Sequence, residues 1–191
     1  MELNPLNLKL FYLINSHHCP ALDTFFEVFR WAGHGVFLIP LLALVYKFRR
    51  YKLRRLVIGL VISLSIVHII KNTFPQYRPV LTLGQDNIHL LLDLHGNSFP
   101  SADAAMAFTI MGALIAGEHR WLQCVLVLYA AMVAYTRVYL GVHFPLDVTI
   151  GAVLGILSTN LHVFYPKSRR KPVDDVALQH HDEEKIPACT R

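Results

Sequence analysis

The sequence predicts an all-α protein, a polytopic bundle of about six helices embedded in a membrane. Of the 191 residues, 54% are hydrophobic and only 16% are charged, and the mean hydropathy is +0.41, which is high for a soluble chain. The apolar residues also gather in uncharged runs that approach, with their flanks, the roughly 20 residues needed to cross a bilayer. A soluble helical protein would show polar faces that these runs lack. The runs cover residues 36–46, 56–70, 104–117, 121–136 and 148–165.

The first 32 residues predict a less regular entry into the bundle. Residues 6–15 (LNLKLFYLIN) have the pattern of a short amphipathic helix, and the HHCP stretch at 17–20 interrupts it. A second helical pattern then begins at residue 21 and carries three charged side chains. Residues 1–32 therefore form either an interfacial helix or a weak first span, so the chain has six crossings or five plus an interfacial helix.

The basic residues fall in alternate connections between the apolar runs, which is the pattern of cytoplasmic loops. Arg120 follows the third run and four basic residues follow the last. We therefore expect the net charge of +5 to reflect membrane topology and contact with the bilayer, with no nucleic-acid partner. The first connection holds Lys47, Arg49, Arg50, Lys52, Arg54 and Arg55.

This topology divides the chain into a membrane-embedded domain, residues 1–166, and a polar cytoplasmic tail, residues 167–191, which we expect to be disordered. The tail contains the pair His180–His181, for which a solvated stretch is a better interpretation than a metal site. The compact size, the short loops and the lack of an organelle signal favour a bacterial inner (plasma) membrane. The remaining polar groups then face the periplasm or exterior.

Two basic residues lie on that outer face, where basic residues should be rare. In the stretch KNTFPQYRP, Lys71 ends an apolar run and Arg78 follows it seven residues later, with prolines stiffening the connection. A single basic residue at a helix end usually extends to the membrane interface. Lys71 and Arg78 together, on this face, favour a binding role.

A helix start on the same face carries an unexpected acid. In the stretch NSFPSADAA, Pro100 and Ser101 predict the start of a helix, with Ser101 as a possible N-cap. The N–H groups of such a start attract anions, although an ordinary cap has the same sequence. Asp103 lies on the first turn, where a carboxylate at the mouth of an apolar helix needs a partner.

The stretch TRVYLGVHFPLD supplies an arginine and a histidine–aspartate pair. Arg137 closes one run, and His143 and Asp147 enter the next. If the helix has begun by His143, the two side chains stack at i and i+4, and the carboxylate fixes the imidazole tautomer. With Lys71 and Arg78, these groups describe a phosphate site with a histidine oriented to attack phosphorus. No carboxylate cage for a divalent ion is visible, so we expect neither a metal nor a cofactor.

These motifs resemble the type 2 phosphatidic acid phosphatases, whose pattern is K-x6-RP, then PSGH, then SR-x5-H-x3-D. This chain has Lys71-x6-Arg78-Pro79, then PSAD at 100–103, then Thr136-Arg137-x5-His143-x3-Asp147, within a resemblance that spans about residues 8–166. The resemblance implies a membrane lipid phosphatase in which His143 forms a phosphohistidine and Asp147 orients it. It also implies four phosphate-binding residues: Lys71, Arg78, Ser101 and Arg137.

Asp103 departs from this pattern, because the family has a histidine there that is taken to protonate the leaving group. Asp103 is then a general acid itself, or the site binds a lipid phosphate without hydrolysis, or the leaving group needs little protonation. The third interpretation predicts a diphosphate substrate, with undecaprenyl diphosphate the favoured one and phosphatidate a poor one. A lipid A 1-phosphatase, a phosphotransferase and a non-catalytic lipid-phosphate binder are the alternatives.

Overall fold

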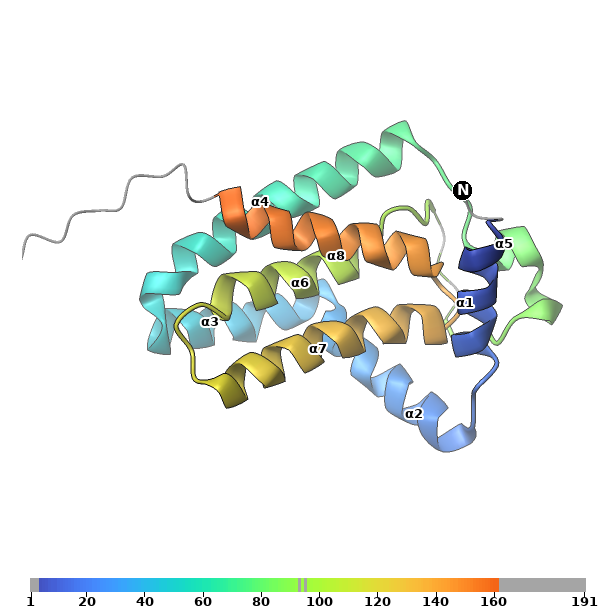
Figure 1. Cartoon of the computed structure of the whole chain (residues 1–191), viewed down its shortest axis with the longest axis horizontal. Helices are drawn as coiled ribbons and strands as arrows, with labels where there is room; N and C mark the ends of the chain where they lie inside the picture. Colours follow the sequence, from blue (N-terminus) through green and yellow to red (C-terminus); the bar gives the residue numbers. More distant parts are fainter. Residues whose placement is uncertain (1–3, 93, 95, 162–191) are drawn as a thin grey trace, which may run out of the picture.

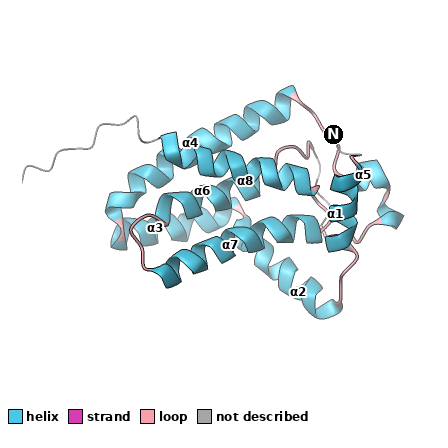
Figure 2. Ribbon diagram, in the orientation of Figure 1, coloured by secondary structure: helices cyan, strands magenta, loops and turns pink. Residues whose placement is uncertain are grey.

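The computed structural model describes residues 4–92, 94 and 96–161, and all regular structure within these ranges is helical (Figures 1 and 2). The prediction of an all-α bundle is confirmed. The described residues form eight α-helices, more than the six expected, because a short helix follows Arg78 and the entry segment is divided. They are α1 (Pro5–Asn15), α2 (Pro20–Phe29), α3 (Leu38–Phe48), α4 (Arg50–Thr73), α5 (Pro79–Leu83), α6 (Ala102–Leu114), α7 (Arg120–Tyr139) and α8 (Pro145–Asn160). The predicted tail, residues 167–191, lies outside the described residues.

Helix α6 forms the centre of the bundle and packs against α4, α7 and α8. Most of its residues are buried, as expected of a helix that is apolar on every side. Its contact with α8 is closest at two glycines: a Cβ atom on Gly151 would lie 2.5 Å from the Ser101 carbonyl oxygen, and one on Gly155 would lie 2.4 Å from that of Ala105. Glycine at both positions therefore allows the two helix backbones to meet directly.

Two of the described helices are individually long and apolar enough to cross a membrane, α4 with 24 residues and α7 with 20. A third candidate is the pair Pro20–Gly33 and Gly35–Phe48, which is bent by 58°. The expectation of five runs of about 20 residues is therefore wrong in length for α6, which has 13 residues. The neighbours of α6 enclose it, so its apolar composition reflects burial in protein.

One end of the bundle joins the basic connection to the turn after α6. The ammonium group of Lys52, which is buried, donates to the carbonyl oxygens of Leu114 and Ala116 and pairs with Glu118. Arg49 lies 3.2 Å from the same carboxylate. Hydrogen bonds from Lys52 and Arg49 lower the pKa of the Glu118 carboxyl. The basic connection and the turn between α6 and Arg120, which the charge pattern assigned to the same side of the membrane, therefore lie together.

The opposite end gathers the end of α4, the end of α7 and the start of α8, with α1 and α5 beside them (right in Figure 1). Helix α1 crosses this end of the bundle. Its Phe11 ring lies 5.4 Å from that of Phe144, and its Asn7 Oδ1 accepts a hydrogen bond from Leu146 N. These contacts hold α1 against the segment that carries the predicted histidine.

Candidate active site

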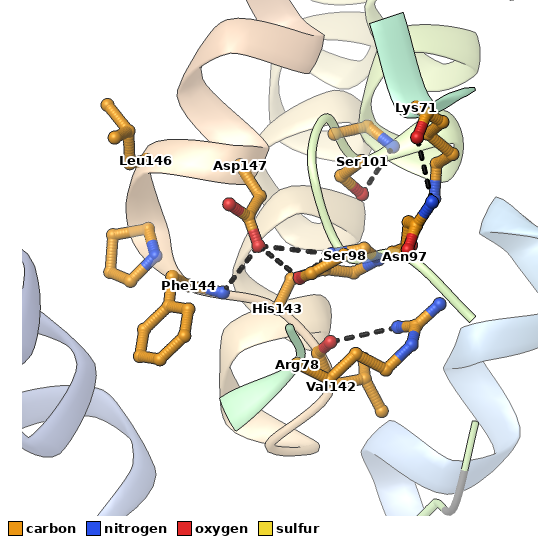
Figure 3. A network of polar contacts seen from close by, with 12 residues as sticks. Lys71, Arg78, Asn97, Ser98, Ser101, Val142, His143, Phe144, Leu146 and Asp147 are labelled. Carbon is orange, nitrogen blue, oxygen red and sulfur yellow. Dashed lines mark hydrogen bonds and ion pairs between the residues drawn. The ribbon is translucent and has the colours of Figure 1, made fainter. Parts of the chain in front are cut away.

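The predicted site residues converge at this end from five elements. Lys71 lies in the last turn of α4, Arg78 precedes α5, and Ser101 precedes α6. Arg137 lies in the last turn of α7, and the start of α8 supplies Asp147. Figure 3 shows Lys71, Arg78 and Ser101 around the segment that contains His143 and Asp147.

The histidine–aspartate pair forms in a different way from the one the spacing suggested. Helix α8 begins at Pro145, so the condition that the helix has begun by His143 is not met. Proline favours the first helical position and disfavours helical geometry in the residue before it. Asp147 Oδ2 instead accepts a hydrogen bond from Phe144 N at 3.0 Å and lies 3.4 Å from His143 Nδ1. Asp147 therefore fixes both the helix start and the imidazole.

Ser98 joins this pair, and the sequence analysis did not identify it. Its hydroxyl lies 3.2 Å from His143 Nδ1 and donates to Asp147 Oδ2 (Figure 3). Since that hydroxyl donates to Asp147, the proton on the imidazole belongs on Nδ1, which leaves Nε2 with its lone pair available for attack. Ser98 lies three residues before Ser101, in a stretch whose recognisable sequence signal was the start of a helix.

Replacing Ser98 by alanine is expected to lower kcat by about 10- to 100-fold, because a hydrogen bond to a charged group is worth about 1.5–3 kcal/mol. The loss should fall on kcat more than on KM, since Ser98 is completely buried and its hydroxyl contacts the histidine–aspartate pair. Steady-state phosphate release measures this. Ser158→Ala, a change to another buried serine of the bundle, is the matched control and should leave kcat within about twofold. An unchanged kcat in Ser98→Ala would remove its positioning role.

His143 lies in the turn between α7 and α8, and its side chain is almost completely buried. Burial lowers the pKa of the imidazole below its usual 6.5, against the opposing effect of Asp147. The neutral form, whose Nε2 lone pair could attack phosphorus, therefore persists into mildly acidic solution.

The acid limb of the kcat/KM profile is accordingly expected below pH 6.5, since activity falls only when His143 gains a proton. Asp147→Asn should move that limb to still lower pH, because the charge that favours the imidazolium is removed. Profiles of both proteins on one substrate measure the shift and separate it from ionisation of the substrate phosphate. A limb that moves upward in Asp147→Asn would contradict the assignment.

The cations Lys71 and Arg78 are fixed by loop carbonyl groups. Lys71 Nζ donates to Asn97 O at 2.9 Å, and Asn97 Nδ2 returns a bond to Lys71 O at 2.8 Å. Arg78 Nη1 donates to Val142 O at 2.9 Å, directly before His143. Both positive charges are thus held at the edge of the histidine site (Figure 3).

Ser101 acts as a helix cap, as its sequence context predicted. Its hydroxyl accepts from Ala104 N, and its own N–H donates to Asp147 O at 3.0 Å. The hydroxyl is completely buried. Ser101 therefore fixes the start of α6 against the start of α8, which aligns the helix N-terminus with the site.

Arg137 and Asp103 form an ion pair, with 2.8 Å between Arg137 Nη1 and Asp103 Oδ2. Arg137 is almost completely buried and also donates to Arg30 O at 2.8 Å. Its Nε is a buried donor that meets no acceptor among the described residues. A phosphoryl oxygen would satisfy that donor. Asp103 thus has a guanidinium partner, which explains how a carboxylate is held at this position.

Known proteins are similar to this chain in sequence and in fold. A crystal structure of LpxE from Aquifex aeolicus matches it with a TM-score of 0.83 and 42% identity, covering 86% of this chain and 99% of that one. The undecaprenyl-diphosphatase of Sulfolobus acidocaldarius is 32% identical over 153 residues, which are 78% of this chain and 73% of the relative. The lipid A 4'-phosphatase of Bacteroides thetaiotaomicron is 44% identical over 61 residues, 31% and 27% of the two chains.

The family assignment follows from the extent of the match. The model of the PAP2 superfamily matches residues 34–171, which is most of the chain and includes all seven predicted site residues. This is the family that the three motifs indicated, and its undecaprenyl-diphosphatase and LpxE relatives are hydrolases. The chain therefore belongs to the PAP2 superfamily and is a multi-pass membrane lipid phosphatase.

Proposed function

We propose that this protein hydrolyses undecaprenyl diphosphate through a phosphohistidine at His143. The observation that carries the proposal is the Asp103–Arg137 ion pair, 2.8 Å long. A carboxylate held in an ion pair is an acceptor and a poor proton donor, so the site suits a leaving group that departs without protonation. The 32% identity to an undecaprenyl-diphosphatase supports the same substrate class.

In this mechanism His143 Nε2 attacks the terminal phosphorus, and the bond from that phosphorus to the bridging oxygen breaks. Undecaprenyl phosphate leaves, and a water molecule then attacks the phosphohistidine to release phosphate and restore the imidazole. Asp147 and Ser98 hold the Nδ1 proton and stabilise the positive charge on the ring. Lys71, Arg78 and Arg137 stabilise the charge on the transferred phosphoryl oxygens.

The choice of substrate rests on leaving-group chemistry. A phosphate monoester has a second pKa of about 6, so undecaprenyl phosphate departs as a stable anion. An alkoxide has a conjugate-acid pKa near that of water, about 16, so phosphatidate needs a proton donor. General acid catalysis is worth about 10²- to 10⁴-fold.

The test compares phosphate release from undecaprenyl diphosphate and from phosphatidic acid by the purified enzyme in the same mixed micelles. We expect kcat/KM to be at least about 100-fold higher for the diphosphate, the lower bound for a missing general acid. Equal values, or a preference for phosphatidate, would contradict the proposal.

A second candidate is a lipid A phosphatase, favoured by the 44% identity over 61 residues to the Bacteroides relative. The anomeric 1-phosphate of lipid A has a better leaving group than a simple alkoxide. The 4'-phosphate named for the Bacteroides relative does not, so this candidate rests on the 1-phosphate. The same site would make a phosphotransferase if an acceptor hydroxyl replaced water. Incubation with ³²P-labelled lipid A or diphosphate separates the cases, because the label appears either as free phosphate or on an acceptor lipid.

We also propose that the site faces the periplasm of a bacterial inner membrane. The site lies at the end of the bundle opposite Arg49 and Lys52, whose connection is rich in basic residues. Such connections remain in the cytoplasm. A membrane-impermeant thiol reagent tests the orientation in a protein whose native Cys19, Cys124 and Cys189 are replaced by serine. In intact spheroplasts it should label a cysteine introduced at Gln85, near the site, and not one at His119.

A further inference from the structure

A second group of polar side chains lies at the site end of the bundle and takes no part in the phosphate chemistry. His18 lies between α1 and α2, Asp23 lies on α2, and His89 follows the short helix Gln85–Asn87. His89 Nε2 lies 3.1 Å from Asp23 Oδ1, and the His18 ring stacks on the His89 ring with 3.7 Å between centroids. One ligand atom from each of the three residues lies within 4.8 Å of the others.

Buried groups hold the side chain of Asp23 and the backbone of His89. The hydroxyl of Tyr139, completely buried, donates to Asp23 Oδ1 at 2.6 Å. Asn15, also buried, binds the backbone of His89 twice: its Nδ2 donates to His89 O and its Oδ1 accepts from His89 N, both at 2.8 Å. A hydrogen bond from an outer group to a carboxylate ligand, as from Tyr139 to Asp23, is typical of metal sites. The Asn15 bonds fix the backbone that carries His89.

One pair of donor atoms already lies close to the separation that a tetrahedral metal ion requires. Zinc binds histidine nitrogen at about 2.0–2.1 Å and carboxylate oxygen at about 2.0–2.2 Å, so donors in a tetrahedral site lie about 3.4 Å apart. The 3.1 Å between His89 Nε2 and Asp23 Oδ1 is slightly shorter than this separation, so a small movement of either side chain would admit the ion. His18 is exposed, so its ring can turn out of the stack and direct a nitrogen to the ion without moving a buried residue. A simple ion pair explains the His89–Asp23 contact but not the second imidazole beside it.

We propose that His18, Asp23 and His89 form a binding site for Zn²⁺ that is separate from the phosphate site. The three ligands leave a fourth position for water, next to a hollow of about 300 Å³. The hollow is lined by Asn15, Ser16, His18, Asp86, Asn87, Ile88 and His89.

A metal ion here would connect α2 to the segment that supports the catalytic turn. Leu91 N donates to Leu140 O, and Gly141, with φ +75°, lies against the same segment, so that a Cβ on it would lie 2.7 Å from His89 O. Since Gly141 stands two residues before His143, the zinc site would stabilise the scaffold behind the nucleophile. Zinc is therefore expected to raise Tm.

The test uses the full chain, purified without a polyhistidine tag and stripped of metal with EDTA. Equilibrium dialysis against Zn²⁺ should show one tightly bound ion per chain, and Co²⁺ should give the visible absorption of a tetrahedral site. Loss of a second-shell partner already costs about 10- to 100-fold in affinity, so His18→Ala and His89→Ala should each weaken binding by at least about 100-fold. His18 is exposed, which keeps its variant informative if His89→Ala unfolds.

The matched controls are His34→Ala and the double variant His180→Ala/His181→Ala, which removes the histidine pair of the tail. Both should retain the zinc ion and the Tm increase. If the stripped protein takes up no zinc on dialysis against Zn²⁺, the proposal is overturned. Zinc that persists in His18→Ala and disappears in the tail variant would also overturn it.

Discussion

Replacing His143 by alanine is expected to abolish phosphate release from every lipid substrate. The imidazole is the only protein nucleophile in the proposed mechanism, and the Ser98 and Asp147 contacts serve to orient it. Removal of a catalytic nucleophile lowers kcat by about 10⁴- to 10⁶-fold in enzymes whose groups act as a unit. Phosphate release from undecaprenyl diphosphate and from phosphatidic acid, each measured at saturating lipid, checks the result.

The control is His119→Ala, which changes an exposed histidine at the opposite end of the bundle. It should leave kcat within about twofold, as expected of a surface substitution. Rapid acid quenching with labelled substrate should trap a phosphorylated protein in the wild type and none in His143→Ala. Turnover that survives in a folded His143→Ala protein would exclude the phosphohistidine mechanism.

The sequence predicted the helical membrane bundle because uncharged runs dominate the chain, and that signal is independent of packing detail. It did not predict the length of α6. A run such as 104–117 is equally apolar whether lipid or protein surrounds it, and only the packing of α4, α7 and α8 shows that protein does. The start of α8 at Pro145 was readable in principle, since proline disfavours a helix through the residue before it.

The cations and the histidine pair were predictable because their order and spacing repeat a family pattern. Ser98 was not, since it lies 45 positions before His143 and approaches it only when the loop before α6 folds against the start of α8. The ion pair of Asp103 with Arg137 likewise spans two helices that the sequence alone does not align. Long-range side-chain contacts carry no local sequence signal, whereas caps such as Ser101 do.

The Asp103–Arg137 ion pair bears on whether Asp103 can donate a proton to the leaving group. The carboxylate lies on the first turn of α6, where the helix dipole favours negative charge, and it is bound to a buried guanidinium. Both features favour Asp103 as a hydrogen-bond acceptor over Asp103 as a proton donor. Arg137, which we propose binds a phosphoryl oxygen, is therefore shared with an acid of the protein itself. On this proposal, no group takes the place of the family's histidine as a proton donor.

Asp103→His is expected to raise kcat/KM for phosphatidic acid by about 100-fold, the lower bound for general acid catalysis, and to change that for undecaprenyl diphosphate by less than about tenfold. The imidazole restores a proton donor, which an alkoxide leaving group needs and a phosphate leaving group does not. It also releases Arg137 for the phosphoryl group. Parallel assays of both lipids in identical micelles give the ratio of the two specificity constants.

Asp103→Asn separates proton donation from charge, because it keeps the shape of the side chain and removes its acidity. If Asp103 only partners Arg137, this variant should hydrolyse the diphosphate within about tenfold of the wild type, since the ion pair is partly exposed and worth about 1–2 kcal/mol. A loss of about 10²-fold or more on both lipids would instead identify Asp103 as the working general acid. A preference for the diphosphate would then need another cause. Lipids with an alkoxide leaving group, such as phosphatidate, would again be candidate substrates.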